Sequence, residues 1–462
     1  MPAQSALPSY HIRPGRGWLN DPNGMTYRDG RWHVFYQHNP AAAVHGDIHW
    51  GHVSSDDLAT WTPHPVAFGP TPDGPDRAGC WSGVFVPDSF RGANEVSDSG
   101  VSDSEVSDSG AQALVAYSAV SDETAHSTTV LRRALDSSPS STLDEWSEPW
   151  VVATTPEADE VAQMRDPFLF TFGGRRWALH GAGLTDGSPA VLLFGCDDPD
   201  AWTYEGLWFT GAGALGAELL GRFPADIWEC PQLVLGDDSD DSDGRAVLVL
   251  ATQHHGSLDD VVAVVGDLEP SSDDPTRPAF NAAAFERLDL GDACYAPQFA
   301  EDPTGSWHLG WVRQSDVPAD PSDPDADLVA GCLTLPRRIG VVGDHVVVTR
   351  AQELDALLSG DSRALAAGGH ELPSACVVRT TGGTLGWPGG VIDLPPVPVE
   401  VWVDGEVVEV YPVLGATPPG SASAPDTPRV PATYRRVGAT WRLDVPTDDT
   451  AWLELVALGG AD

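Results

Sequence analysis

The stretch Trp18–Gly24, which reads WLNDPNG, is the most informative segment of this 462-residue chain. It places Asp21 in a turn-forming sequence rich in proline, asparagine and glycine. Two further segments of similar character follow, MRDP with Asp166 and IWECP with Glu229. Only folding can bring carboxylates so far apart in sequence into one pocket. A pocket built around paired carboxyl groups is typical of a glycosidase.

The neighbours of these carboxylates predict different protonation states. A retaining glycosidase needs an ionised nucleophile and a protonated acid on opposite sides of the scissile bond. Asp21 is flanked by Asn20 and Asn23, whose amide donors favour a carboxylate. Glu229 follows Trp228 in an apolar stretch, where burial would raise its pKa. We therefore predict that Asp21 is the nucleophile and Glu229 the acid/base.

Asp166 has a charged neighbour, Arg165, which predicts that its carboxyl group is ionised and binds sugar hydroxyls instead of transferring protons. Taken singly, each segment has an ordinary structural explanation: a turn, a surface ion pair before a strand, or a glutamate that caps a loop. Their joint occurrence favours a shared pocket over three separate explanations.

Short runs of β-branched and aromatic residues, separated by Gly, Pro and Asp, predict an all-β protein. The expected strands are residues 31–37, 113–120, 176–181, 190–196, 246–253, 261–268 and 307–313, then 375–379, 399–411, 440–445 and 450–458. The larger, N-terminal part fits a propeller or a sandwich, and the smaller part fits a sandwich. Apolar residues three and four apart in Ala351–Leu358 predict a helix at the join.

Neither the acidic runs nor the cysteines predict a metal site. Residues 96–110 contain three similar pentapeptides, VSDSG, VSDSE and VSDSG. Residues 237–244 read DDSDDSDG without the ligand spacing of a calcium loop, so both segments are expected to be hydrated loops. No CxxC pair or zinc-type histidine spacing occurs, and the cysteines are expected to be small buried residues. They are Cys80, Cys196, Cys230, Cys294, Cys332 and Cys376.

The composition predicts a strongly acidic surface. There are 68 acidic residues against 25 basic ones, giving a formal net charge of −43, and no lysine occurs. Such a surface repels nucleic acid and anionic membranes, so neither is an expected partner. Self-repulsion of this size calls for screening by salt, which predicts a halophilic protein. A GC-rich genome would explain arginine in place of lysine, but it would not explain the charge.

The length allows two domains, because single cores rarely exceed about 250–300 residues. The first 17 residues contain no apolar signal-peptide core, and no apolar run long enough to span a membrane follows. We therefore expect a soluble protein of the cytoplasm.

The ordered motifs resemble glycoside hydrolase family 32, the family of invertases, inulinases and levanases. The matching segments are YHIRPGRGWLNDPNG from Tyr10, FYQHNP, HWGHVSSDDLATW, CWSG, RDP, WECP, LDLGDACYAPQ, LGWVRQ, and CLTLPRR ending at Arg338. The resemblance implies a five-bladed β-propeller, here residues 1–345, followed by a β-sandwich, residues 346–462. It also implies cofactor-free, retaining hydrolysis of β-fructofuranosides such as sucrose or short fructans.

The same resemblance assigns roles to individual residues. Asp21 becomes the nucleophile, Asp166 the stabiliser of the transition state and Glu229 the acid/base. Substrate contacts are implied for Asn20, Gln37, Trp81, Ser82, Arg165 and Trp311. By contrast, Trp50 of the HWGH motif is expected to pack inside the first blade, and Glu409 in the sandwich is expected to be structural.

One departure from the family pattern concerns the substrate. Where the family commonly has a Trp-Gly pair that lines the fructose subsite, this chain has His45-Gly46. An imidazole can still donate a hydrogen bond to the sugar, but a wide aromatic wall is lost.

Three alternatives to fructoside hydrolysis remain open on the sequence. Fructosyl transfer would replace water by a sugar hydroxyl as the acceptor. Hydrolysis of sucrose 6-phosphate would require an arginine at the leaving-group subsite. A sugar-binding relative would keep the fold without the chemistry, but the intact trio of carboxylates argues against it. The oligomeric state is not predicted.

Overall fold

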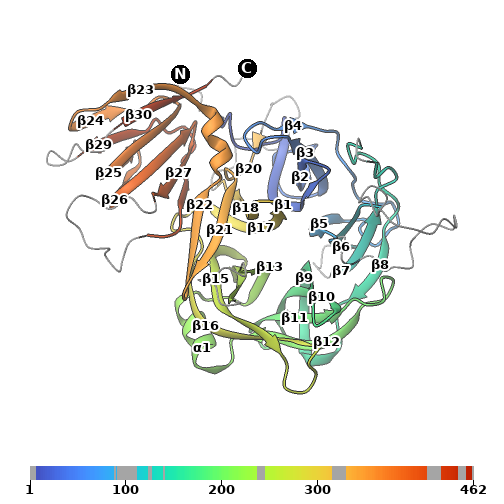
Figure 1. Cartoon of the computed structure of the whole chain (residues 1–462). Coiled ribbons are helices and arrows are strands. Elements are labelled where there is room, and N and C mark those ends of the chain that lie inside the picture. The colour runs from blue at the N-terminus through green and yellow to red at the C-terminus, as the bar shows by residue number, and fades with distance from the viewer. Residues whose placement is uncertain are drawn as a thin grey trace, which may run out of the picture.

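The computed structural model describes residues 7–87, 90, 112–122, 127–138, 141–236, 245–314, 329–413, 428–445 and 454–459. Both predicted hydrated loops, 96–110 and 237–244, lie outside these residues. The described strands form five sheets around a common centre and a further sheet system beside them (Figure 1). The predicted five-bladed β-propeller with a C-terminal β-sandwich is therefore confirmed.

Each blade is an antiparallel sheet that grows outward from the centre in chain order. Blade I contains β1 (Gly17–Arg28), β2 (Arg31–Asn39), β3 (His49–Ser55) and β4 (Thr62–Pro63), and blade II contains β5 (Gly79–Phe85), β6 (Leu114–Val120), β7 (Ser127–Arg133) and β8 (Trp150–Thr154). Blade III contains β9 (Val161–Phe172), β10 (Arg175–Leu184), β11 (Pro189–Gly195) and β12 (Thr203–Thr210). Blade IV contains β13 (Ile227–Leu235), β14 (Arg245–His254), β15 (Ser257–Pro270) and β16 (Pro278–Arg287).

Blade V contains β17 (Cys294–Asp302), β18 (Gly305–Val312), β21 (Arg337–Val342) and β22 (His345–Arg350), with β20 (Cys332–Leu333) paired to β18. The short strand β19 (Val329–Ala330) runs parallel to β1 and so joins the last blade to the first. The seven strands predicted up to residue 313 correspond to β2, β6, β10, β11, β14, β15 and β18. Because β22 crosses the predicted domain boundary, we propose to place that boundary after Arg350.

The innermost strands, β1, β5, β9, β13 and β17, contact one another in a closed ring. In each, two residues oppose a single residue of the next strand, which makes a β-bulge. The bulges hold residues 20–21, 81–82, 166–167, 230–231 and 296–297. Residues in or directly beside all five bulges line one small central cavity, so the bulges lie at one level. Bulges re-aim side chains and are common beside active sites.

Three of the bulges share a backbone feature, a left-handed residue directly before a proline. The φ angles are 59° at Asp166, 47° at Cys230 and 43° at Ala296. Positive φ is rare outside glycine and persists only where the surrounding structure enforces it. The following proline has no amide hydrogen for the sheet, so regular pairing is interrupted at this level in three of the blades and resumes beyond it.

Hydrophobic residues between neighbouring blades hold the ring together. Trp50 is completely buried and packs on Phe35, Phe68 and Tyr117, which confirms its expected role inside the fold. Further buried clusters join blade II to blade III and blade III to blade IV. All six cysteines are buried and unpaired, as expected.

The C-terminal unit is a sandwich built on two long, bent strands, β25 (Ala375–Trp387) and β26 (Gly390–Asp404). In one layer β25 pairs with β29 (Arg442–Val445), which pairs with β24 (Gly368–Glu371). The other layer adds β30 (Glu454–Leu458), β23 (Leu358–Ala364), β27 (Val407–Pro412) and β28 (Ala432–Arg435). Gly382 and Gly383, with φ of 76° and 113°, allow the bend between the layers.

The helices differ from the sequence-based expectation. The helix predicted over Ala351–Leu358 is present as a 3-10 helix, η3 (Gln352–Leu357), because β22 and β23 leave no room for a longer α-helix. The α-helix α1 (Gly213–Arg222) was not predicted, since three glycines lower its intrinsic helix propensity. A short 3-10 helix, η2 (Ala158–Glu160), precedes β9. Among the described residues, no helix is long and apolar enough to cross a membrane.

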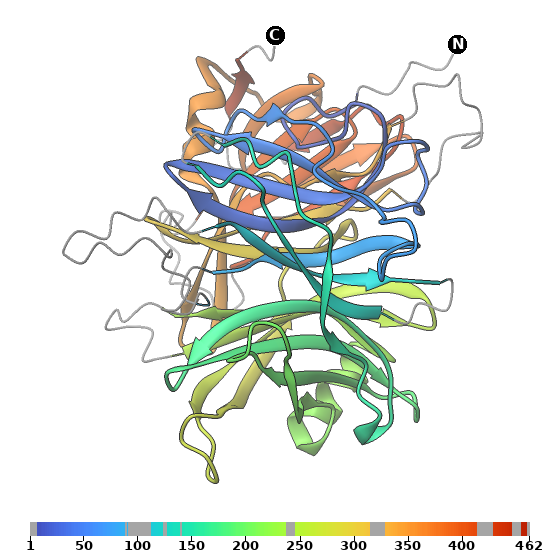
Figure 2. The same ribbon diagram turned by 90° about the vertical axis from the view of Figure 1, so that its right-hand side faces the viewer.

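The sandwich lies beside blades I and V (Figures 1 and 2). A buried cluster joins Trp402 and Tyr411 of the sandwich to Leu19 of blade I and Trp307 of blade V. This cluster brings the first and last blades into one core with the second domain.

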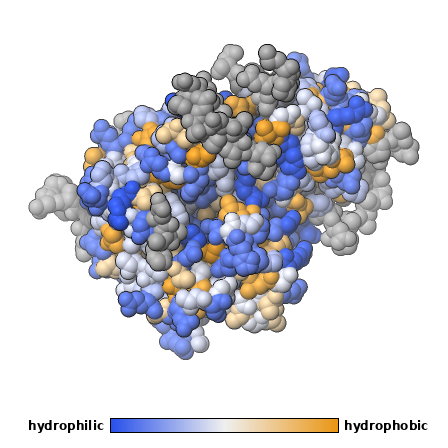
Figure 3. Space-filling view, turned by 180° about the vertical axis from the view of Figure 1, so that it is seen from behind, coloured by the Kyte–Doolittle hydropathy of each residue, from blue (hydrophilic) through white to orange (hydrophobic). Residues whose placement is uncertain are grey.

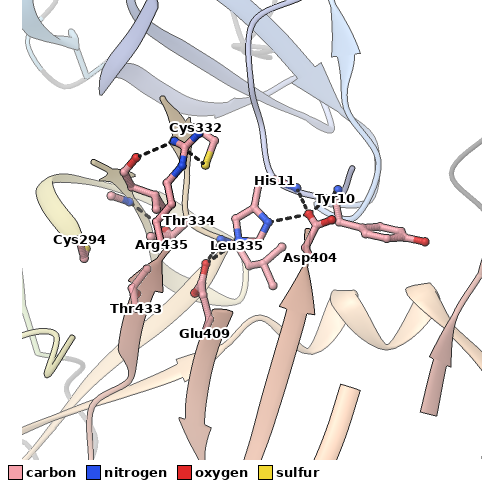
Figure 4. A network of polar contacts seen from close by, with 12 residues as sticks. Tyr10, His11, Cys294, Cys332, Thr334, Leu335, Asp404, Glu409, Thr433 and Arg435 are labelled. Carbon is pink, nitrogen blue, oxygen red and sulfur yellow. Dashed lines mark hydrogen bonds and ion pairs between the residues drawn. The ribbon is translucent and has the colours of Figure 1, made fainter. Parts of the chain in front are cut away.

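A buried charged network crosses the same boundary (Figure 4). His11 lies between two sandwich carboxylates, with Nδ1 2.7 Å from Asp404 Oδ2 and Nε2 2.9 Å from Glu409 Oε1. The amide of Leu335 donates to Glu409 Oε1 at 2.8 Å, and Arg337 donates to Oε2 at 2.6 Å. These contacts confirm the structural role expected for Glu409.

The network makes domain docking sensitive to pH. Burial alone would lower the pKa of His11, but the hydrogen bonds and charges of Asp404 and Glu409 raise it to about 9. Unfolded histidine titrates near about pH 6.5. The stabilisation from charged His11 is therefore complete below about pH 6.5 and is lost as the pH rises through about 9.

Replacing His11→Gln should lower the free energy of unfolding by about 3 kcal/mol near pH 6, because Asp404 is left buried without its cationic partner. The variant should also lose the decline in stability between about pH 6.5 and 9 that the wild type shows. Denaturant unfolding of both proteins across this range measures the effect. An unchanged pH dependence in the variant would contradict the assignment.

Candidate active site

The carboxylate of Asp21, in the bulge of β1, is surrounded by hydrogen-bond donors. Ser82 Oγ and Gln37 Nε2 donate to Oδ2 at 2.6 and 3.0 Å, and Asn20 Nδ2 donates to Oδ1 at 3.1 Å. Trp18 Nε1 donates to Asn20 Oδ1 at 2.8 Å and thereby orients that amide. These contacts fix one orientation of the carboxylate and favour its ionised form.

Asp166, in the bulge of β9, is tied to the blades on both sides. Its amide donates to Ser118 Oγ of blade II at 2.7 Å, and its Oδ2 accepts from the amide of Cys230 of blade IV at 2.9 Å. The thiol of Cys230 lies 3.5 Å from Asp166 Oδ2 and 3.8 Å from Asp21 Oδ2. One side chain therefore contacts both aspartates, which share a single pocket.

Glu229 is the last paired residue before the bulge of β13. Tyr295 on β17 donates its hydroxyl to Oε2 at 2.7 Å. Arg165 Nε and Gln253 Nε2 each lie 3.5 Å from Oε1. Because Cys230 directly follows Glu229, the third carboxylate belongs to the same pocket. The structure brings all three predicted carboxylates together.

Trp81, Arg165 and His45 form one side of this pocket. The guanidinium carbon of Arg165 lies 5.7 Å from the centre of the Trp81 ring, and Arg165 also donates to Gln163 Oε1 at 2.6 Å. His45, from the segment between β2 and β3, meets Trp81 edge-on at 6.1 Å and is exposed. The imidazole therefore stands at the rim, beside the half-buried indole.

Trp311 supports the pocket from behind. It is buried in β18, pairs in register with Tyr295, and packs edge-on against Trp18 with ring centres 5.6 Å apart. Since Tyr295 contacts Glu229 and Trp18 contacts Asn20, Trp311 backs two side chains of the pocket. Its own contact with substrate stays a prediction.

Burial raises the pKa of both proposed reacting carboxyl groups. The pKa of Asp21 is raised by burial even though Ser82 and Asn20 act to lower it. The donors beside Asp21 favour its charged form, as predicted, but the loss of hydration is the larger effect on its pKa. The pKa of Glu229 is raised by burial, as its apolar neighbours predict, and the hydrogen bond from Tyr295 acts in the opposite direction.

Asp166 differs most from its expected state. Burial, followed by the negative charge of Glu229, raises its pKa to about 7, and Arg165 offsets only part of that rise. The prediction that Arg165 keeps Asp166 ionised is therefore wrong. The guanidinium contacts Glu229 as well, so its charge is shared between two acids. A pKa of about 7 leaves Asp166 partly protonated at neutral pH.

Three residues of the pocket were not predicted as site residues: Tyr295, Cys230 and Gln253. A signal for Tyr295 exists in the sequence. Like Glu229, Tyr295 stands two residues before the proline of an inner-strand bulge. Aligning the chain on these prolines would have placed the tyrosine beside the glutamate.

A five-bladed propeller with three carboxylates gathered at the bulges of its inner strands has the architecture of a propeller glycosidase. The sequence matches the Glycosyl hydrolases family 32 N-terminal domain over residues 11–350. The chain therefore belongs to glycoside hydrolase family 32, as its motifs predict.

Two relatives are similar to this chain in sequence over about three quarters of its length, and a solved structure is similar in fold over nearly all of it. The raffinose invertase of Escherichia coli is 29% identical over 343 residues, which cover 72% of this chain and 62% of the invertase. The sucrose-6-phosphate hydrolase of Bacillus subtilis is 29% identical over 363 residues, covering 77% of this chain and 67% of the hydrolase. The solved sucrose-6-phosphate hydrolase from Lactobacillus gasseri superposes with a TM-score of 0.73 at 20% identity, over 99% of this chain and 93% of that chain. This structural likeness shows the fold.

Replacing Tyr295→Phe tests the contact with Glu229. Because the tyrosine hydrogen bond lowers the pKa of Glu229, its removal should raise that pKa and move the alkaline limb of kcat/KM to higher pH. The pH dependence of kcat/KM for the release of glucose and fructose from sucrose measures this shift. Tyr204→Phe is a matched control, since it removes a 2.8 Å bond to Asp159 at the outer edge of blade III. An alkaline limb that stays in place would contradict the role of Tyr295.

Proposed function

We propose that the protein is a retaining β-fructofuranosidase that releases terminal fructosyl units from sucrose or short fructans. The observation that carries this proposal is the unequal surroundings of Asp21 and Glu229 within one pocket. Burial raises the pKa of both groups, but Asp21 accepts hydrogen bonds from three side chains, whereas Glu229 accepts its shortest bond from a single tyrosine. Family membership and the names of the relatives support a fructoside as the substrate.

In the first step, Asp21 attacks the anomeric carbon of the fructosyl unit while Glu229 donates its proton to the glycosidic oxygen. The bond between that carbon and oxygen breaks, the leaving sugar departs with the proton, and a fructosyl ester of Asp21 forms. Ser82 and Gln37 both bind Oδ2 of Asp21, which leaves Oδ1 the better placed oxygen for attack.

In the second step, Glu229 is a carboxylate and accepts a proton from water as the water oxygen attacks the same carbon. The ester bond breaks and Asp21 leaves as a carboxylate. Arg165 and Tyr295 both favour ionised Glu229, so they stabilise the state in which it acts as a base.

Asp166 and the pocket wall bind the sugar in this scheme. The carboxyl group of Asp166, fixed by the Cys230 amide, accepts hydrogen bonds from hydroxyl groups of the fructosyl unit. Asn20, Gln37, Ser82 and Arg165 supply further polar contacts, and Trp81 offers an apolar face. His45 at the rim is placed to contact the leaving sugar.

A phosphorylated substrate is the second candidate, because several of the similar proteins are sucrose-6-phosphate hydrolases. Arg165 is engaged by Glu229 and Gln163, so it is poorly suited to bind a phosphate as well. We therefore propose unphosphorylated fructosides as the preferred substrates. The ratio of kcat/KM for sucrose and sucrose 6-phosphate decides between them, and analysis of products at high sucrose separates hydrolysis from fructosyl transfer.

The variants Asp21→Asn and Glu229→Gln should each lower the turnover of sucrose by more than about a thousandfold, because each removes a step of covalent or acid/base catalysis. Release of glucose and fructose from the purified protein measures turnover. Asp267→Asn, at a surface ion pair between β14 and β15, is the matched control and should keep wild-type activity. Near-normal turnover in either pocket variant would refute the assignment.

We further propose that the protein works in a salt-rich, reducing cytoplasm. The net charge of −43 and the absence of lysine support the first feature, and six unpaired buried cysteines support the second. The face in Figure 3 is covered mainly by hydrophilic residues, with hydrophobic residues scattered among them.

The melting temperature should rise as KCl increases from about 0.1 M to about 3 M, because screening shortens the Debye length from about 10 Å to 3 Å or less. Differential scanning calorimetry at fixed pH measures the change. A neutral osmolyte at matched osmolality controls for effects other than screening. A melting temperature that stays constant or falls with KCl would exclude the halophilic assignment.

A further inference from the structure

Three histidines form a row across blade I, on the strands outside the catalytic ring. His33 lies on β2, His52 on β3, and His64 directly after β4. The rings of His33 and His52 stack at 5.3 Å, and those of His52 and His64 at 4.4 Å. Asp144, in the connection between β7 and β8 of blade II, meets the end of this row. Ionisable groups from two blades therefore converge at one place.

Two buried polar atoms of this cluster have no hydrogen-bond partner among the described residues. One possible ligand atom from each of His52, His64 and Asp144 lies within 4.8 Å of the other two, and His64 Nδ1 is 3.8 Å from Asp144 Oδ1. His52 is completely buried, and neither its Nδ1 nor Asp144 Oδ1 has a hydrogen-bond partner among the described residues. Buried polar atoms without partners are rare and costly. This pair of unsatisfied acceptors points to a bound cation.

The other ring nitrogens are held in the manner of metal ligands. His52 Nε2 is 3.1 Å from His33 Nδ1, and His64 Nε2 is 2.8 Å from Ser54 Oγ. When each Nε2 carries the hydrogen of that bond, both Nδ1 lone pairs are free for a ligand. Such support of the second nitrogen orients histidines at metal sites.

We propose that His52 Nδ1, His64 Nδ1 and Asp144 Oδ1 bind one Zn²⁺ ion that links blade I to blade II. Two imidazoles, a carboxylate and a water molecule form a donor set that zinc accepts. Tetrahedral zinc at about 2.0–2.1 Å from each ligand places the donor atoms about 3.4 Å apart, so the three atoms must converge by roughly 1 Å. Asp144, whose side chain is 30% exposed and lies in a strand connection, is the ligand able to move.

No metal site was predicted from the sequence, because that prediction used the spacing of cysteines and histidines along the chain. Two of the ligands are on neighbouring strands of one blade, and the third comes from the next blade. Such a constellation has no recognisable spacing in the sequence. Its role is structural, since it joins outer strands and takes no part in the steps proposed for the carboxylate pocket.

The test uses the full chain, freed of metal with a chelator and titrated with ZnCl₂ by calorimetry. The expected result is one saturable Zn²⁺ per chain and a higher melting temperature in its presence. His64→Gln and Asp144→Asn, which change only partly buried ligands, should each weaken binding by at least about tenfold. His345→Gln, at the surface pair with Glu286, is the matched control and should bind as the wild type does.

Cobalt supplies an independent readout of geometry. Co²⁺ bound in place of Zn²⁺ should give the intense visible absorption of a tetrahedral site, and the absorption should be lost in Asp144→Asn and kept in His345→Gln. Absence of saturable Zn²⁺ binding would overturn the proposal. Binding of equal strength in the wild type and in both ligand variants would overturn it as well, because the ion would then be held elsewhere.

Discussion

The structure depends on one constraint: all five inner strands must leave regular pairing at one level while the sheets around that level stay intact. In a continuous ladder, successive side chains point to opposite faces of the sheet. Strict alternation alone would then decide how each side chain is directed along the central axis. The bulges at 20–21, 81–82, 166–167, 230–231 and 296–297 break this alternation. Left-handed backbone at Asp166 and Cys230, before prolines, keeps the break in place. The same backbone feature thus interrupts the ladder and presents the polar groups of the pocket.

Three buried acids at one level disfavour one another's ionised forms, and the remaining pocket residues partly offset this effect. Burial raises the pKa of each, and for Asp166 burial together with the smaller effect of the Glu229 charge raises it to about 7. The compensating groups are distributed unequally, with donors concentrated on Asp21 and the positive charge of Arg165 shared by Glu229 and Asp166. In the mechanism we propose, this inequality, more than the identity of the acids, distinguishes Asp21 as the attacking group from Glu229 as the group that carries a proton.

Features set by residues close together in the sequence could be predicted, whereas features set by contacts between distant segments could not. Asp21, Asp166 and Glu229 could be identified because each lies in a distinctive local motif, and strands such as β10 and β14 could be placed from alternation. The α-helix at Gly213–Arg222 was missed because its stability comes from tertiary packing that overrides three glycines. The pKa of Asp166 was misjudged because the flanking Arg165 reports only a local charge, whereas burial is decided by the other blades. Tyr295 was missed for the same reason, since its partner lies on another strand.

Closure of the ring explains why a second domain packs where it does. The parallel pairing of β19 with β1 involves only two residue pairs, so hydrogen bonds between strands contribute little to joining the last blade to the first. Glu409 of the sandwich receives His11, which precedes blade I, on the same oxygen as the amide of Leu335, which leads into blade V. Arg337 of blade V neutralises the other oxygen. A single buried carboxylate thus holds both ends of the propeller chain. Removing one partner of such a network leaves an unpaired charge buried in the interior, so separating the first and last blades costs much free energy. The sandwich therefore stabilises the ring that positions the pocket.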